Sequence, residues 1–73
     1  MPVDNSRMQE IVGRNIRAAR NSQGLSLRRF AAMVGMDYSH LSNLERGKVD
    51  PNISTVIKIA EGLDVPIAQL FKE

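Results

Sequence analysis

The sequence predicts an all-α fold, a compact five-helix domain that spans residues 1–73. Apolar residues recur at intervals of three and four along the chain, and no run shows the strict alternation of a half-buried strand. Gly24, Gly35 and Gly47 divide the chain into helix-sized segments. The composition agrees with this fold class, because 42% hydrophobic and 25% charged residues are ordinary values for a globular protein.

The first predicted helix runs from about residue 7 to residue 22 and ends before Gly24. Its buried stripe is formed by Met8, Val12, Ile16 and Ala19. A second, short helix is expected after Ser26, whose hydroxyl suits an N-cap, and it ends at Gly35, which can adopt the left-handed conformation. Residues 1–6 precede the pattern and are expected to be flexible.

Three further helices follow from the same signals. Asp37 is expected to cap a third helix that ends at Gly47. Asn52 is expected to cap a fourth, whose apolar residues cover an unusually wide face. Pro66 suits the first turn of a short fifth helix, which contains Ile67, Leu70 and Phe71.

The charge of the chain is concentrated in its middle. Residues 14–48 hold seven Arg and Lys side chains against two acidic ones, whereas both flanking segments are slightly acidic. This distribution is typical of a surface that faces a polyanion. A solvated charged face would show the same composition, so composition alone leaves both interpretations open.

Several function classes are excluded by what the sequence lacks. It has no Cys and one His, no HExxH motif and no paired carboxylates on one face, so we expect neither an enzyme nor a metal or cofactor site. The longest apolar stretch, residues 30–36, is far shorter than the ~20 residues of a membrane span. The first ten residues lack a signal-peptide core. We therefore expect a cytoplasmic protein without membrane contact.

The spacing between the second and third helices predicts a helix-turn-helix over about residues 27–46. Two helices that cross steeply through a short turn need a small residue at their closest approach, which Ala31 supplies. The turn needs a residue that accepts a positive φ, which Gly35 supplies. Leu41 and Leu44 would then face inward. An ordinary αα-hairpin would show the same four residues, and they do not decide between the two.

A wider set of residues resembles one family of DNA-binding domains. The residues Gly24-Leu25-Ser26 stand before the second helix, and Leu44-Glu45-Arg46-Gly47-Lys48 stand at the end of the third. With the segments around them, they make the chain similar to the Cro/cI phage-repressor type of helix-turn-helix domain, also called the xenobiotic-response-element family. The resemblance extends from about Gly13 to Phe71. It implies a five-helix, phage-repressor-like domain whose third helix lies in the DNA major groove.

The resemblance also implies roles for individual side chains. The expected base-reading residues are Tyr38, Ser39, Ser42 and Asn43, of which Asn43 can pair bidentately with adenine. The expected phosphate contacts are Arg28, Arg29, His40, Arg46, Lys48 and Asn52. Arg14 or Arg17 would add longer-range attraction. Without the family context, the polar residues of the third helix would be read simply as the solvated side of an amphipathic helix.

One observation supports DNA binding without the resemblance. Arg28 and Arg29 occupy the first turn of the second helix, where the helix dipole disfavours each cation by about 0.3–1 kcal/mol. A nearby phosphate would make the same arrangement favourable, because the free N–H groups of a helix start also bind anions. A tolerated pair of surface charges is the alternative.

The chain departs from the family pattern at two positions. Leu27 stands where the family usually has Gln, a residue that contacts phosphate and braces the reading helix, so this contact should be absent. Either Arg28 takes over the phosphate or the half-site is held a little differently on the DNA. Asp64 stands where many relatives have Gly, a milder change because Asp tolerates the left-handed region. The resemblance further implies a partly buried structural salt bridge between Arg20 and Glu45.

The predicted function is sequence-specific binding of double-stranded DNA by a transcriptional regulator, with repression favoured. The apolar surplus near the C-terminus predicts a homodimer, which would bind a palindromic operator. Its expected interface consists of Ile53, Ile57, Val65, Ile67 and Phe71. No small-molecule effector is expected. The alternative is a protein-interaction module of the same fold, such as an antitoxin-like or controller partner.

Overall fold

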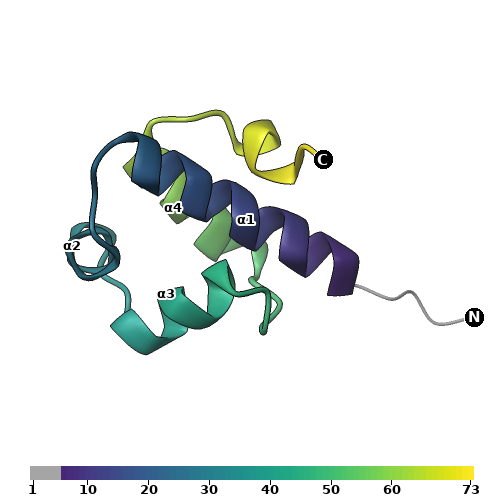
Figure 1. The fold of residues 1–73 in the computed structure, drawn as a ribbon, viewed down its shortest axis with the longest axis horizontal. Helices are drawn as coiled ribbons and strands as arrows, with labels where there is room; N and C mark the ends of the chain where they lie inside the picture. The colour runs from purple at the N-terminus through teal and green to yellow at the C-terminus, as the bar shows by residue number, and fades with distance from the viewer. Residues whose placement is uncertain (1–5) are drawn as a thin grey trace, which may run out of the picture.

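The computed structural model describes residues 6–73 and contains four α-helices and a short 3₁₀ helix (Figure 1). The α-helices are α1 (Ser6–Ser22), α2 (Leu27–Met33), α3 (Tyr38–Glu45) and α4 (Ile53–Leu63), and the 3₁₀ helix is η1 (Ile67–Phe71). No strand occurs within this range. The predicted all-α fold class is therefore confirmed.

The expectation for the C-terminal helix needs correction, and the one for the N-terminal segment is largely outside the described residues. The fifth helix is a 3₁₀ helix, and Pro66 precedes it as the N-cap residue instead of lying in its first turn. A segment of only five residues favours the tighter 3₁₀ form, which proteins use in short pieces. The flexible segment expected over 1–6 lies outside the described residues except for Ser6, which begins α1.

The long helix α1 crosses the molecule and contacts α3, α4 and η1 (Figure 1). Val12 and Ile16 are buried as predicted, and Ile11 is buried beside them. Met8 is 42% exposed, so its assignment to the buried stripe was wrong. It lies near the open N-terminal end of α1, where it borders a surface pocket instead of the core. The side chain of Asn15 ties α1 to the C-terminal segment by donating to the carbonyl of Leu70 at 2.9 Å.

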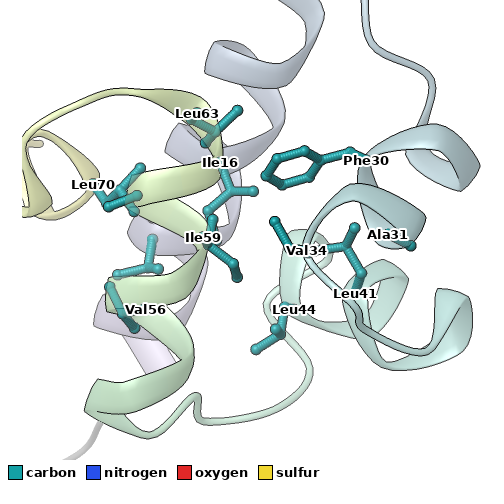
Figure 2. Packing of buried hydrophobic residues seen from close by; sticks show 12 residues of the cluster. Ile16, Phe30, Ala31, Val34, Leu41, Leu44, Val56, Ile59, Leu63 and Leu70 are labelled. Carbon is teal, nitrogen blue, oxygen red and sulfur yellow. The ribbon is translucent and has the colours of Figure 1, made fainter.

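The core forms where α1, α2, α3 and α4 meet (Figure 2). The Phe30 ring points from α2 toward Ile16 of α1. Leu41 and Leu44 of α3 are buried, as the helix-turn-helix spacing predicts. Burying a side chain of this size stabilises a protein by about 1.5–3 kcal/mol, so these contacts hold α2 and α3 against the rest of the molecule.

All four α-helices end in the same local structure. A residue with positive φ follows each helix, and the next residue donates its N–H to a carbonyl five positions back, which is the Schellman pattern. The positive-φ residues are Gly24, Gly35, Gly47 and Asp64. At Asp64, φ is 57° and ψ is 46°, so this position does adopt the left-handed conformation that the sequence led us to expect.

The predicted N-caps are correct in position, and two of the three make the expected bond. The hydroxyl of Ser26 accepts from the N–H of Arg29 at 3.0 Å, and Oδ1 of Asn52 accepts from the N–H of Thr55 at 2.9 Å. Asp37 occupies the N-cap position of α3, but its side chain makes no capping hydrogen bond. The carboxylate is exposed beside the positive end of the helix, where its charge is favourable without a direct bond.

The closest approach between α1 and α3 occurs at Gly13. A Cβ atom at this position would lie 2.3 Å from the carbonyl oxygen of Leu44 and 2.7 Å from that of Glu45. Both distances are far below van der Waals contact, and both oxygens belong to backbone that cannot move independently. Gly13 therefore lets α1 pack directly on the C-terminal end of α3.

Within residues 6–73, no helix combines the length and the hydropathy that crossing a membrane requires.

Candidate nucleic-acid interface

Helices α2 and α3 form a helix-turn-helix with one buried and one exposed side. Ala31 is buried where α2 meets α3, and Gly35 has a φ of 66° in the turn between them. Leu41 and Leu44 hold the inner side of α3 in the core. The opposite side of α3 is left on the molecular surface, free to contact a partner.

The four predicted base-reading residues all lie on α3, outside the core. Tyr38 and Ser39 are exposed in the first turn, and Ser42 and Asn43 are half-buried one turn later. The side-chain amide of Asn43 makes no hydrogen bond to any residue of the described range, so its donor and acceptor remain available. An unengaged amide of this kind has the groups needed for a bidentate contact with adenine.

A cation–π contact joins the first turns of α2 and α3. The guanidinium carbon of Arg28 lies 4.7 Å from the centroid of the Tyr38 ring. Such contacts contribute about 0.5–1 kcal/mol at exposed sites. The sequence predicted a role for each residue separately but not their contact. The side chain of Leu27 cannot hydrogen-bond, and the stack supplies a contact between the two helix starts that does not depend on it.

The predicted phosphate contacts form two groups beside α3. Arg28 and Arg29 are exposed at the start of α2, and Arg46 and Lys48 are exposed just beyond the end of α3. His40 is exposed on α3 itself. Asn52 is also exposed, and because its Oδ1 caps α4, its amide nitrogen remains as the donor for a phosphate.

Arg20 and Glu45 form the ion pair that the resemblance implies. Nε of Arg20 donates to Oε2 of Glu45 at 2.7 Å, and Nη2 donates to Oε1 at 3.0 Å. Nη1 of Arg20 also donates to the carbonyl of Leu25 at 2.7 Å. The two charged side chains are only 10% and 5% exposed. The hydrogen bond to Glu45 raises the pKa of Arg20 and outweighs the opposite effect of burial. The pair joins α1 to the last residue of α3.

The structure separates the five residues of the predicted dimer interface. Ile53 and Phe71 are 60% and 37% exposed, and together with Met8 they line a surface pocket of about 190 Å³. Ile57 is exposed on α4 outside that pocket. Val65 and Ile67 are half-buried and pack against the core. Of the five predicted interface residues, only Ile53, Ile57 and Phe71 are therefore exposed.

The described residues offer no arrangement suited to a metal ion. Over residues 6–73, no group of three His, Cys, Asp or Glu side chains lies close enough together to hold one. The candidate site is thus a polar and cationic surface built on α2 and α3.

This geometry agrees with a comparison to known families, in which a model of the helix-turn-helix family HTH_3 matches residues 16–70. The chain belongs to this helix-turn-helix family. The matched range contains both helices of the helix-turn-helix and the Arg20–Glu45 pair. Membership confirms the resemblance found in the sequence. Relatives that share this domain are named as HTH-type transcriptional regulators.

The relatives of the chain are named as transcriptional regulators. The chain is 36% identical over 58 residues to the uncharacterized HTH-type transcriptional regulator y4dL of Sinorhizobium fredii. This alignment covers 80% of the present chain and 30% of the relative. The chain is also 36% identical over 61 residues to the HTH-type transcriptional regulator PuuR of Escherichia coli, in an alignment that covers 84% of the present chain and 33% of PuuR. The chain thus spans about a third of the length of these two relatives.

Solved structures show the same fold. The restriction-modification controller protein C.AhdI of Aeromonas hydrophila superposes with a TM-score of 0.82 at 30% identity, over 86% of this chain and 96% of that one. An HTH_3 family transcriptional regulator of Vibrio cholerae superposes with a TM-score of 0.87 at 31% identity, over 93% of this chain and 38% of that one. The five-helix, phage-repressor-like fold expected from the sequence is confirmed.

Proposed function

We propose that this chain binds a specific double-stranded DNA sequence with α3 in the major groove and thereby regulates transcription, acting as a repressor. The observation that supports this most strongly is the outer side of α3. It presents an unengaged Asn43 amide, and cationic groups stand at both ends of the helix. A helix of eight residues held on a rigid core can enter the groove without rearrangement of the fold.

Base reading and backbone binding are assigned to different residues. Tyr38, Ser39, Ser42 and Asn43 face the base edges and set the sequence preference. Arg28, Arg29, His40, Arg46, Lys48 and Asn52 contact phosphates and supply sequence-independent affinity. The Arg28–Tyr38 stack connects the two groups, because it couples a phosphate contact to the first residue of the reading helix.

The proposal includes a homodimer that binds a palindromic operator. Ile53, Ile57 and Phe71 supply exposed apolar surface for the contact, with Val65 and Ile67 adding only their partly exposed sides. Two reading helices would then lie about 34 Å apart, one turn of duplex. Sedimentation equilibrium at high micromolar concentration should show a concentration-dependent dimer, and a strict monomer under these conditions would contradict this part of the proposal.

Three expectations from the sequence belong to the same proposal. Residues 1–73 act as one DNA-binding domain, with no small-molecule effector. An operator-binding protein acts where the DNA is, so the proposed location is the cytoplasm. Repression follows from occupancy of a promoter by a small domain, which blocks access of the polymerase.

The alternative is a protein-interaction module, such as an antitoxin-like or controller partner. The exposed Ile53 and Phe71, which share a surface pocket, favour a protein contact of some kind. Similarity to a controller protein over nearly its whole length is compatible with either role. The two functions differ in whether the isolated chain selects a DNA sequence.

The deciding experiment is selection of bound duplexes from a random pool, carried out at two salt concentrations. The proposal predicts enrichment of an inverted repeat whose half-sites are about ten base pairs apart, with weaker binding at the higher salt. Absence of enrichment at either salt concentration would exclude sequence-specific binding and leave the protein-interaction module as the better account.

A further inference from the structure

A hollow of about 200 Å³ lies between α1, α2 and α3. Its lining comes from all three helices and from the residue after α3, and consists of Arg17, Arg20, Leu27, Ser42, Glu45 and Arg46. Three of these six residues are arginines, and they approach the same space from α1 and from the end of α3. The residue contributed by α2 is Leu27, whose side chain has no group that can hydrogen-bond.

The hollow has two positive charges without a partner in the described part of the chain. Glu45 neutralises Arg20 through a bidentate, nearly buried ion pair. Arg17 and Arg46 are exposed, and neither belongs to an ion pair within residues 6–73. Two like charges that share one hollow repel each other, and a bound anion removes this repulsion. The chemistry of the lining therefore suits an anion.

The hollow shares a residue with the side of α3 that is proposed to read bases. Ser42 belongs to both, since it is a predicted base-reading residue and also lines the hollow. Arg46 follows Ser42 by one helical turn and so extends the same side of α3. A duplex that contacts α3 along this side would therefore lie close to the hollow.

We propose that this hollow holds a phosphodiester of the DNA backbone between Arg17 and Arg46. The inference rests on the proposed function and assigns a specific contact to a residue of α1. Arg17 then supplies the donor that Leu27 cannot, and the planar guanidinium groups of Arg17 and Arg46 match the oxygens of a phosphate. Arg14 lies one turn earlier on α1, does not line the hollow, and adds only general attraction.

The test compares Arg17→Gln with Arg14→Gln in the full chain, using a duplex obtained by the selection described above. Both side chains are exposed and both substitutions remove one charge, so they differ mainly in their relation to the hollow. Arg17→Gln should weaken binding at least about tenfold, as expected for a lost charge-assisted hydrogen bond, and should lower the slope of log K against log salt by about 0.9. Arg14→Gln should change the affinity and the salt slope much less. Thermal melts of the two variants should match that of the wild type.

Replacement of single phosphates by neutral methylphosphonates locates the contact. In the wild type, one replacement per half-site should weaken binding at least as much as Arg17→Gln does, because it removes the charge that both Arg17 and Arg46 contact. The same replacement should weaken the binding of Arg17→Gln by a smaller factor, since only the contact with Arg46 is left to lose. Equal effects of Arg17→Gln and Arg14→Gln on a duplex that the wild type binds would overturn the inference and leave the proposed function intact. A wild type that binds no duplex would overturn both.

A free anion is the other possible source of the same chemistry. If inorganic phosphate raises the melting temperature of the wild type but not of Arg17→Gln, while both bind DNA equally, the hollow is a site for free phosphate and the assignment to DNA is wrong. If Arg17→Gln loses DNA affinity and inorganic phosphate has no effect on melting, the DNA assignment is supported.

Discussion

In the proposed complex, single side chains on α3 and beside it contact different parts of a DNA duplex. Asn43 has an amide with free donor and acceptor groups, whereas Arg28 presents only a cation, held against the ring of Tyr38. An amide paired with a base edge discriminates between base pairs, whereas a guanidinium placed on the DNA backbone responds to the phosphate charge that every sequence shares. Substitution of the two kinds of residue should therefore have distinguishable effects.

Asn43→Ala should relax sequence preference at one base pair of each half-site. The lost bidentate contact corresponds to about 1–3 kcal/mol of discrimination against the wrong base. Measuring affinities for a panel of duplexes with single substitutions checks this, with Ser39→Ala as a matched variant that alters preference at a different position. An unchanged pattern of preferences would remove Asn43 from the base-reading residues.

Arg28→Ala should weaken binding to all duplexes by a similar factor. The slope of log K against log salt should fall by about one unit, because one phosphate contact is lost. Arg28→Lys keeps the charge and should retain most of the slope. Titrations at four or five salt concentrations provide the comparison, and a loss confined to one preferred sequence would show that Arg28 reads a base instead.

Between elements, the position of α3 depends on two contacts with α1. The Arg20–Glu45 pair joins α1 to the last residue of α3, and Gly13 allows the backbones to approach at the same end. Both contacts hold the C-terminal end of the reading helix, while the Arg28–Tyr38 stack lies at its N-terminal end.

Arg20→Met should lower the free energy of unfolding by about 3–5 kcal/mol, because it leaves the carboxylate of Glu45 buried without a counter-charge. The double variant Arg20→Met/Glu45→Leu should recover much of this loss, since no charge remains buried. Thermal melts of the two variants give the measurement. A loss below about 1 kcal/mol for the single variant would mean that the pair has no structural role.

Gly13→Ala should lower the free energy of unfolding by about 3 kcal/mol or more. The added methyl group would meet two backbone oxygens of α3, and neither can move without displacing the helix. Gly24→Ala is the informative comparison, since a Cβ there meets nothing within 4 Å and only the positive φ is unfavourable. Chemical denaturation of both variants should show the larger loss at Gly13; equal losses would contradict a tight contact between α1 and α3.

Helix ends could be predicted from the sequence because they are local. Ser26 caps α2 and Gly35 terminates it through atoms only a few residues away, so the residue types alone are sufficient. Gly13 could not be predicted in the same way, since its importance depends on carbonyl oxygens that are distant along the chain. Met8 was misassigned for a related reason, because periodicity does not show where along a helix the core ends.

The candidate site was predictable to a similar extent. The polar residues of α3 follow from its position after Gly35 and from the family resemblance. The Arg28–Tyr38 stack and the hollow beside Arg17 each need the relative placement of separate helices, which no spacing in the sequence reveals. The sequence likewise does not show that the five residues predicted for the dimer interface differ in exposure. Val65 and Ile67 pack partly against the core, whereas the other three are exposed.

At the scale of the whole molecule, the fold acts as a rigid support that presents one short helix. The core lies on one side of α3, and the cationic groups of α2 and of the segment after α3 stand at its two ends. The first turn of α3 is already exposed in the free protein. We therefore expect the fold of the free protein to be preserved in the complex.

The central claim, that α3 enters the DNA, is tested most directly by backbone amide shifts during titration with a selected duplex and with a random one. The account predicts that residues 38–43 show the largest shifts with the selected duplex and smaller ones with the random duplex, whereas the amides of α4 change little unless dimerisation is linked to binding. Unchanged α3 amides in the presence of a bound duplex would contradict the account.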